Sequence, residues 1–190
     1  MKSYLFLIAS CLLLQSCFND PPPEPVNYTY KSLRDTTSSY LHPFELHMFA
    51  DTSADFYFTV GLTHDTRGTH ANFFMLPLKS NRVQVKGEGD IPVFANGDAI
   101  SGTLATPYRW DKITGKFCEL IVKDPPPIDS TWEGAWSGAV KKYIPVQLHD
   151  HNKVYNGWIS MSIDTVARKM ILHEFGWNKI AGENAVAGRR

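Results

Sequence analysis

The chain has 190 residues with 19 basic and 19 acidic side chains, so its formal net charge is zero. A neutral chain without a basic cluster is a poor partner for nucleic acid, which we therefore exclude. The length suits a single domain with a sizeable core. Beyond residue 16, no apolar stretch approaches the ~20 residues that a membrane-spanning helix needs.

The beginning of the chain has the parts of a secretory signal. Lys2 supplies one positive charge, residues 4–14 form an apolar run, and the small Ser16 precedes Cys17. These features predict a signal peptide over residues 1–16 that is removed from the mature chain. A first transmembrane helix is the alternative, but the apolar run is shorter than a span requires.

Leu14-Gln15-Ser16-Cys17 also resembles the lipobox of bacterial lipoproteins, where an aliphatic, a variable and a small residue precede the cysteine that receives lipid. The resemblance implies a lipid-anchored protein of the cell envelope that contacts the membrane through Cys17. Because one acyl chain anchors only weakly, it also implies lipid on both the thiol and the new amino terminus. Phe18 favours the outer membrane, on its periplasmic or surface face. A plain secretory signal is the alternative.

The cysteines predict no internal disulfide. Cys11 lies in the signal and Cys17 is used for lipid, so Cys118 is left alone. The hydrophobic core must then supply the stability of the domain, even in an oxidising compartment.

A proline-rich segment follows the anchor. Residues 20–25 carry four prolines, which favours a polyproline II spacer that rises ~3.1 Å per residue. Residues 28–40 continue with Thr, Ser and charged residues and show no clear period. We therefore predict a lipidated tether over residues 17–40 and a single domain over residues 41–190.

From Phe44 onward, apolar and polar residues alternate with the period of a half-buried strand. In the first half of the domain we expect strands at residues 44–48, 56–62, 71–78 and 82–86. Asn96-Gly97, between Val93-Phe94 and Ile100, is the strongest hairpin signal in the chain.

The same pattern continues in the second half. We expect strands at residues 117–122, 143–149, 155–163 and 169–175, with the prolines of residues 124–127 in a long loop between sheets. No amphipathic helix longer than about two turns is visible. Frequent turns and period-two patterning predict an all-β fold, either an antiparallel β-sandwich or an open barrel.

A second resemblance covers residues 90–188. The stretches Tyr155-Asn-Gly-Trp158-Ile, residues 171–178 and residues 185–188 are similar to a pattern in secreted and lipid-anchored bacterial β-sandwich proteins, and Tyr143-Ile144 extends the match upstream. The match departs from the pattern at Val186, where the usual residue is Ile. This family has no assigned chemistry, so the resemblance implies the fold and no function.

The best candidate metal ligands flank a turn. A turn centred on Arg67 would set His64 directly opposite His70, with Cβ atoms ~5 Å apart, and with Asp65 they could hold zinc or copper. They lie at an exposed hairpin mouth without a supporting partner in the sequence, so solvated turn residues are the alternative. We therefore predict no cofactor.

The other histidines do not combine into a metal site. Pairing by turn positions sets His149 opposite Val154 and His173 opposite Ile159. These positions lie ~17 Å apart along the strand, too far for one metal ion. His149 and His151 are predicted to be solvated turn residues.

Nucleophilic catalysis has little support in the sequence. There is no Gly-x-Ser-x-Gly motif, and Cys118 alternates with apolar neighbours as a small core residue does. Paired carboxylates for hydrolysis leave no trace in sequence spacing. No catalytic residue is predicted.

Tryptophans are the best candidates for ligand binding. Trp132 and Trp136 lie four residues apart in a Gly-containing segment, and Trp158 alternates with Ser160 and Ser162 on a face that is wetter than the core. Exposed aromatic faces stack on sugars, whereas buried ones pack a core. Core packing is the alternative for all three.

The sequence therefore favours a non-catalytic binding or structural module of the envelope, with a glycan or another envelope protein as its partner. An envelope hydrolase is the alternative, with dispersed carboxylates or a metal held at His64 and His70.

Overall fold

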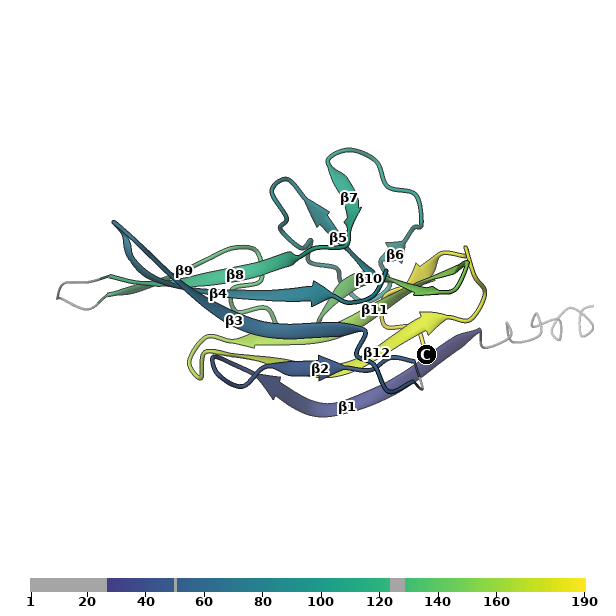
Figure 1. The fold of residues 1–190 in the computed structure, drawn as a ribbon, viewed down its shortest axis with the longest axis horizontal. Helices are drawn as coiled ribbons and strands as arrows, with labels where there is room; N and C mark the ends of the chain where they lie inside the picture. Colours follow the sequence, from purple (N-terminus) through teal and green to yellow (C-terminus); the bar gives the residue numbers. More distant parts are fainter. Residues whose placement is uncertain (1–26, 50, 124–128) are drawn as a thin grey trace, which may run out of the picture.

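Two antiparallel sheets pack face to face in the computed structural model, which describes residues 27–49, 51–123 and 129–190 (Figure 1). This confirms the predicted all-β fold in its sandwich form. Within the described ranges there is no helix, and therefore none long and apolar enough to cross a membrane. The predicted signal peptide, the lipidation site at Cys17 and the prolines at 124–127 lie outside the described residues.

One sheet has six strands and the other has five. The six-stranded sheet runs in the order β1 (Tyr28–Ser38), β12 (Lys169–Asn178), β11 (Lys153–Asp164), β10 (Lys142–Asp150), β5 (Arg82–Lys86) and β7 (Tyr108–Asp111). The five-stranded sheet runs in the order β2 (Phe44–Leu46), β3 (Phe56–Asp65), β4 (Gly68–Pro77), β8 (Gly115–Val122) and β9 (Ser130–Glu133). A short pair joins β6 (Ala99–Ile100) to β13 (Ala185–Val186).

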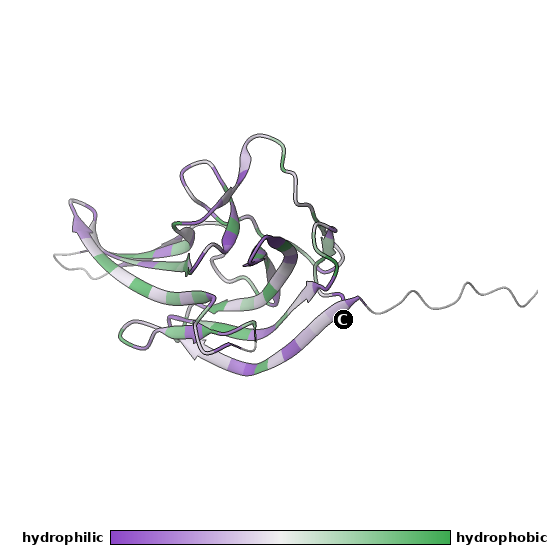
Figure 2. Ribbon diagram, turned by 45° about the vertical axis from the view of Figure 1, so that its right-hand side comes forward, coloured by the Kyte–Doolittle hydropathy of each residue, from purple (hydrophilic) through white to green (hydrophobic). Residues whose placement is uncertain are grey.

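The main core lies between the two sheets. Alternate residues of each strand point inward, as the period-two pattern predicts, and hydrophobic and hydrophilic segments follow one another along the strands (Figure 2). The largest fully buried side chains in this core are aromatic or long aliphatic: Trp136, Phe56, Phe58, Phe73, Phe175, Leu46, Met75, Ile91, Leu120 and Ile144. Aromatic residues thus take the place of a disulfide in holding the sheets together.

A second, smaller core lies on the outer face of the six-stranded sheet. Trp158 points away from the sandwich interior, and Ile100 of β6, Ala185 of β13 and Ala187, which follows β13, cover it. Tyr143 meets its ring edge-on at a centroid distance of 5.3 Å. The β6–β13 pair therefore closes one end of the outer face and leaves the middle of that face open.

The predicted tether extends too far along the chain. Residues 28–38 form β1, an eleven-residue edge strand that pairs with β12. The strand is mostly polar (Figure 2). Only two of its eleven residues, Tyr28 and Ser38, are buried. An edge strand of this kind carries no alternating apolar signal, so its pattern resembles that of a spacer.

The prediction of a hairpin at Asn96-Gly97 is also wrong. The turn forms, with Gly97 at φ 92°, but the two flanking segments part. Phe94 pairs with Tyr143 and Ile100 pairs with Ala185. Burial of Ile100 in the outer core offsets the loss of a local hairpin.

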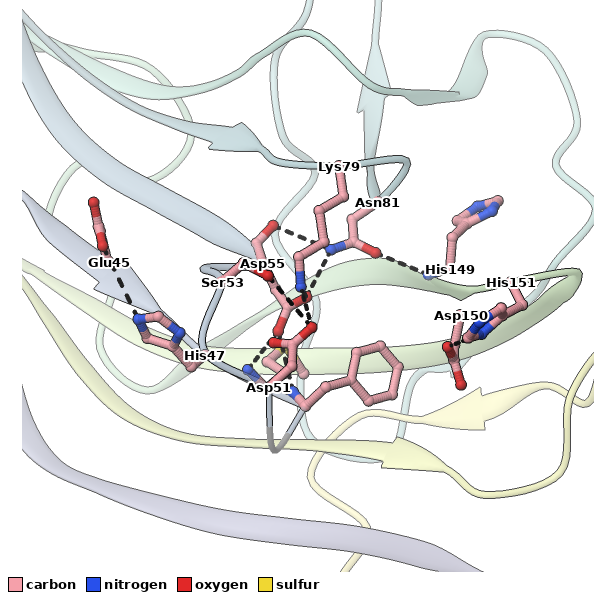
Figure 3. A network of polar contacts seen from close by, with 12 residues as sticks. Glu45, His47, Asp51, Ser53, Asp55, Lys79, Asn81, His149, Asp150 and His151 are labelled. Carbon is pink, nitrogen blue, oxygen red and sulfur yellow. Dashed lines mark hydrogen bonds and ion pairs between the residues drawn. The ribbon is translucent and has the colours of Figure 1, made fainter.

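Buried Asp55 fastens the two sheets at one end of the sandwich (Figure 3). Its carboxylate accepts hydrogen bonds from the backbone N–H groups of Met48 (2.7 Å) and Phe49 (3.1 Å) and from the side chains of Lys79 (3.1 Å) and Asn81 (3.1 Å). Asn81 Oδ1 in turn accepts the N–H of His149 on β10 at 2.8 Å. A buried carboxylate with this many donors is a structural anchor, since its hydrogen-bonding capacity is used within the protein.

Candidate functional site

A polar cleft opens on the outer face of the six-stranded sheet, beside the small outer core. It has a volume of about 260 Å³. We call it the outer-face cleft, and its lining residues are Ser32, Asp35, Lys141, Tyr143, Ser160, His173, Glu174 and Arg190. Three neighbouring strands, β1, β12 and β11, supply five of these residues, so the cleft is built mainly on the sheet itself.

A bulge on β12 aims His173 into this cleft. Ser160 pairs with Glu174, but the next pair is Met161 with Leu172, so His173 has no partner on β11. Leu172 and Phe175 both enter the main core, and the odd spacing between them requires one extra residue on the outer side. Bulges that re-aim a side chain are typical of functional sites.

The edge strand β1 bulges at the same level. Ser32 pairs with Glu174 and Thr36 pairs with Leu172, so residues 33–35 stand against the single residue His173. Within this bulge Arg34 and Asp35 have φ values of 53° and 57°. Left-handed backbone at a residue with a side chain costs roughly 1–2 kcal/mol, and such strain concentrates at functional sites.

The two bulges create a continuous chain of polar contacts. His173 Nδ1 lies 2.6 Å from Asp35 Oδ1, and His173 Nε2 lies 2.7 Å from Ser162 Oγ. The backbone N–H of Lys141, itself at φ 46°, donates to the same Ser162 oxygen at 2.9 Å. A carboxylate only accepts hydrogen bonds, so the tautomer of a neutral His173 that fits both contacts carries its proton on Nδ1 and accepts the hydroxyl proton of Ser162 at Nε2.

A second network forms the other wall of the cleft. Glu174 Oε2 accepts hydrogen bonds from Tyr30 Oη at 2.7 Å and from Arg190 at 2.8 Å, and the Arg190 guanidinium lies 4.8 Å from the centre of the Tyr30 ring. The hydrogen bond to Glu174 raises the pKa of Tyr30, with burial adding to the effect. Burial raises the pKa of Tyr143, and the charge of Glu174 adds to it. Both phenols therefore stay neutral donors at physiological pH.

The cleft thus combines hydroxyl groups, carboxylates, cations and one histidine within a small volume. Such a set can bind a hydroxyl-rich ligand, because each hydroxyl of the ligand both donates and accepts a hydrogen bond. The contacts of His173 with Ser162 and Asp35 also match the roles of nucleophile, base and orienting carboxylate. Ser162 itself is 6 % exposed and Asp35 is 73 % exposed in its side chain.

The predicted pairing of His64 with His70 is wrong. The turn is one residue tighter than expected, so Asp65 pairs with Gly68, His64 with Thr69 and His70 with Thr63. A shift of one residue reverses the face, and the two imidazoles lie on opposite sides of β3 and β4. In the described ranges no group of three or more His, Cys, Asp or Glu side chains could hold a metal ion.

His70 instead belongs to a network of charges. Its Nε2 lies 2.8 Å from Asp65, and its Nδ1 lies 3.6 Å from Glu119 on β8. Lys116 lies 2.6 Å from Glu119. Although burial acts in the other direction, the hydrogen bond from Lys116 lowers the pKa of Glu119. This network leaves His70 4 % exposed, so it is not available as an open ligand.

The predicted tryptophan platform does not form. Trp136 is fully buried in the main core, and its Nε1–H donates to the backbone oxygen of Ile91 at 2.9 Å. Trp132 is partly buried at the edge of the inner face, with its ring 5.2 Å from that of Phe73. Trp158 is fully buried in the outer core. The alternative, that these tryptophans pack in a core, is therefore correct for Trp136 and Trp158.

The predictions for Cys118, His149 and His151 are confirmed in part. Cys118 is buried, as predicted, and burial raises the pKa of its thiol to about 12. His149 pairs with Val154, as predicted. It is only half-exposed, however, because it lies within β10 rather than in the turn, while His151 is 94 % exposed.

Sequence reasoning did not find Asp35, Ser162 or His173 as a group. Asp35 lies in the segment assigned to the tether, and His173 was expected opposite Ile159, whereas Ile159 pairs with Phe175. Only the bulges bring the three side chains together. The one signal available was the spacing of Leu172 and Phe175, which breaks the period of two.

Comparison with known proteins gives no match to a family model, to a curated protein or to a solved structure. The candidate site therefore depends on its own geometry.

Proposed function

We propose that this chain is a lipid-anchored module of the bacterial envelope that binds a hydroxyl-rich ligand, of the glycan class, in the outer-face cleft. The proposal for the anchor is supported by the apolar run of residues 4–14 and by Leu14-Gln15-Ser16-Cys17. The proposal for the ligand is supported by the composition and preorganisation of the cleft.

The observation that carries the ligand class is the fixed position of Glu174. Tyr30 and Arg190 both bind one of its oxygens, Oε2, so its carboxylate is oriented before any ligand arrives. Tyr143 packs against buried Trp158 and is one of the residues that line the cleft. Preorganised polar groups around a small aromatic surface are how proteins recognise sugars and related polyols, since ordering costs are paid in advance.

The size of the cleft favours a small ligand over an envelope protein. A stable protein partner buries roughly 800 Å² of each surface, whereas the outer-face cleft is a local hollow of about 260 Å³, close to the lower end of small-molecule pockets at about 300 Å³. The cleft lies on the outer face of a sheet and beside an edge strand, where a chain end or a branch of a larger glycan can enter.

The anchor is tested by metabolic labelling of cells with an alkyne fatty acid. We expect label on the wild-type protein and none on Cys17→Ala, with the lipid mass on a new amino-terminal cysteine. A matched control is Cys118→Ala, which keeps the label. An unmodified amino-terminal peptide would remove the anchor from the proposal.

The ligand is tested with full-length protein in detergent on an array of bacterial glycans, followed by titration of the best binder. Glu174→Gln keeps the shape of the wall but removes the charge that orders Tyr30 and Arg190, and we expect at least a tenfold loss of affinity, about 1.4 kcal/mol. Glu45→Gln, on the exposed part of β2, is the control. Binding that survives Glu174→Gln unchanged would place the ligand elsewhere.

A further inference from the structure

The contacts around His173 have the connectivity of an acyl-transfer site. Ser162 Oγ is 2.7 Å from Nε2, and Asp35 Oδ1 is 2.6 Å from Nδ1. Each group contacts the nitrogen that its role requires: the nucleophile faces the nitrogen that accepts a proton, and the carboxylate faces the nitrogen that carries one. Such a site is recognised by geometry and roles and not by sequence order.

Two features of the backbone mark this arrangement as built rather than incidental. Bulges on both β1 and β12 are needed to bring Asp35 to His173. The backbone is held in the left-handed region at Asp35 and again at Lys141, whose N–H fixes the Ser162 oxygen. Elsewhere in the described chain an exposed pair with similar geometry, His151 and Asp150 at 2.7 Å, contacts no serine and has no bulge.

We propose that Ser162 is the nucleophile of a hydrolase that cleaves a short-chain carboxylic ester. The identity of the alcohol part as a polyol rests on the function proposed above. The cleavage of the ester by Ser162 does not rest on it. Ser162 is 6 % exposed and lies behind His173, which lines the outer-face cleft, so the acyl group that it attacks must be small.

The reaction has two balanced halves. The Ser162 oxygen forms a bond to the acyl carbon while its proton passes to His173 Nε2, the carbon–oxygen bond to the alcohol breaks, and His173 returns that proton to the leaving alkoxide. Water then attacks the acyl-serine, gives one proton to His173, and the carboxylic acid leaves as the proton returns to Ser162. Ester and water thus become acid and alcohol. Lys141, which lines the cleft, supplies the positive charge beside the developing oxyanion.

Asp35 acts as a positioning residue. Its side chain is 73 % exposed, so water screens its charge more strongly than that of a buried carboxylate. Loss of a buried triad carboxylate lowers kcat by about 10⁴. For Asp35→Asn we expect a decrease of roughly 10- to 100-fold in kcat with a smaller change in KM, because the residue acts on the reacting carbonyl only by orienting His173.

The test uses full-length protein in detergent with a fluorophosphonate probe and with p-nitrophenyl acetate. In the probe reaction the Ser162 oxygen bonds to phosphorus and fluoride leaves, so mass spectrometry locates the adduct. We expect an adduct on the Ser162 peptide that is absent in Ser162→Ala and slowed at least tenfold in Asp35→Asn. Ser130→Ala, an exposed serine of β9, and Asp150→Asn, the matched aspartate beside a histidine, leave labelling and hydrolysis unchanged.

No adduct on Ser162, or ester hydrolysis that is equal in wild type and Ser162→Ala, would overturn the proposal. Thermal melts of each variant check that it is folded. If Ser162→Ala does not fold, Asp35→Asn still tests the proposal, because the Asp35 side chain is mostly exposed and its substitution leaves the core intact. Neither probe carries a sugar, so a failure of glycan binding and a failure of acyl chemistry are separate results.

Discussion

Asp35 on β1 and His173 on β12 approach within 2.6 Å across the outer edge of the six-stranded sheet, although 138 residues separate them in the chain. Each lies in a bulge of its own strand, and the two bulges face one another. We expect the double-mutant cycle Asp35→Ala and His173→Ala to give a coupling of about 0.5–1 kcal/mol in the free energy of unfolding by urea. Additivity of the two substitutions would mean that the contact does not persist in solution.

Gly68 closes the β3–β4 turn in a place that admits no side chain. It has φ 129°, and a Cβ there would lie 2.2 Å from the backbone oxygen of Val122. Gly89 has a similar φ of 121° but open space around it. Both Gly→Ala changes introduce backbone strain. We expect Gly68→Ala to lower the free energy of unfolding by at least about 2 kcal/mol more than Gly89→Ala does, because only Gly68 also has a steric clash. Equal losses in denaturant unfolding would contradict the clash.

Trp136 and Trp132 are predicted to differ in their contribution to stability. Trp136 is fully buried, meets Phe117 edge-on at 5.2 Å and donates a hydrogen bond to Ile91. We expect Trp136→Ala to lower the free energy of unfolding by about 3–5 kcal/mol. Trp132→Ala, at the edge of the core, should cost roughly 1–2 kcal/mol. A small loss at Trp136 would show that this residue is not central to the core.

The charges around Glu119 predict how the free energy of unfolding changes at acid pH. The pKa of Glu119 is lowered in the folded protein from its ordinary value of 4.5. The stability it contributes is therefore present above pH 4.5 and is lost as the pH falls through the lower, folded value. We expect Glu119→Gln to flatten the loss of unfolding free energy as the pH falls below 4.5.

Arg67 lies 3.8 Å from Glu119 and 3.6 Å from Glu133. Glu133→Gln is therefore the control for this measurement, because the Glu133 side chain is 51 % exposed. An acid limb that is the same in wild type and Glu119→Gln would show that other carboxylates set it.

Much of the sandwich could be predicted from period-two patterning. Strand β3 buries one face and therefore alternates clearly, and β11 alternates in residue type although the small outer core buries its second face as well. The register of β10 with β11 also followed from sequence, since Asp150 and Lys153 flank a two-residue turn and set His149 opposite Val154. Tight turns fix register locally.

The candidate site could not be predicted in the same way. A bulge inserts one residue without any composition of its own, and the bulge at His173 moves every later residue of β12 by one position against β11. Edge strand β1 buries little, so nothing in its sequence separates it from a spacer. The error at His64 and His70 has the same origin, because a turn shorter by one residue exchanges the two faces of a strand.

The burial of tryptophan in two separate cores has a practical consequence. Trp136 lies between the sheets and Trp158 lies beneath the β6–β13 cover, and both are shielded from water. Indole fluorescence then records two different events: detachment of the cover shifts the emission of one ring to the red, and separation of the layers shifts the other. Single-tryptophan variants would let a spectrometer follow each step by itself.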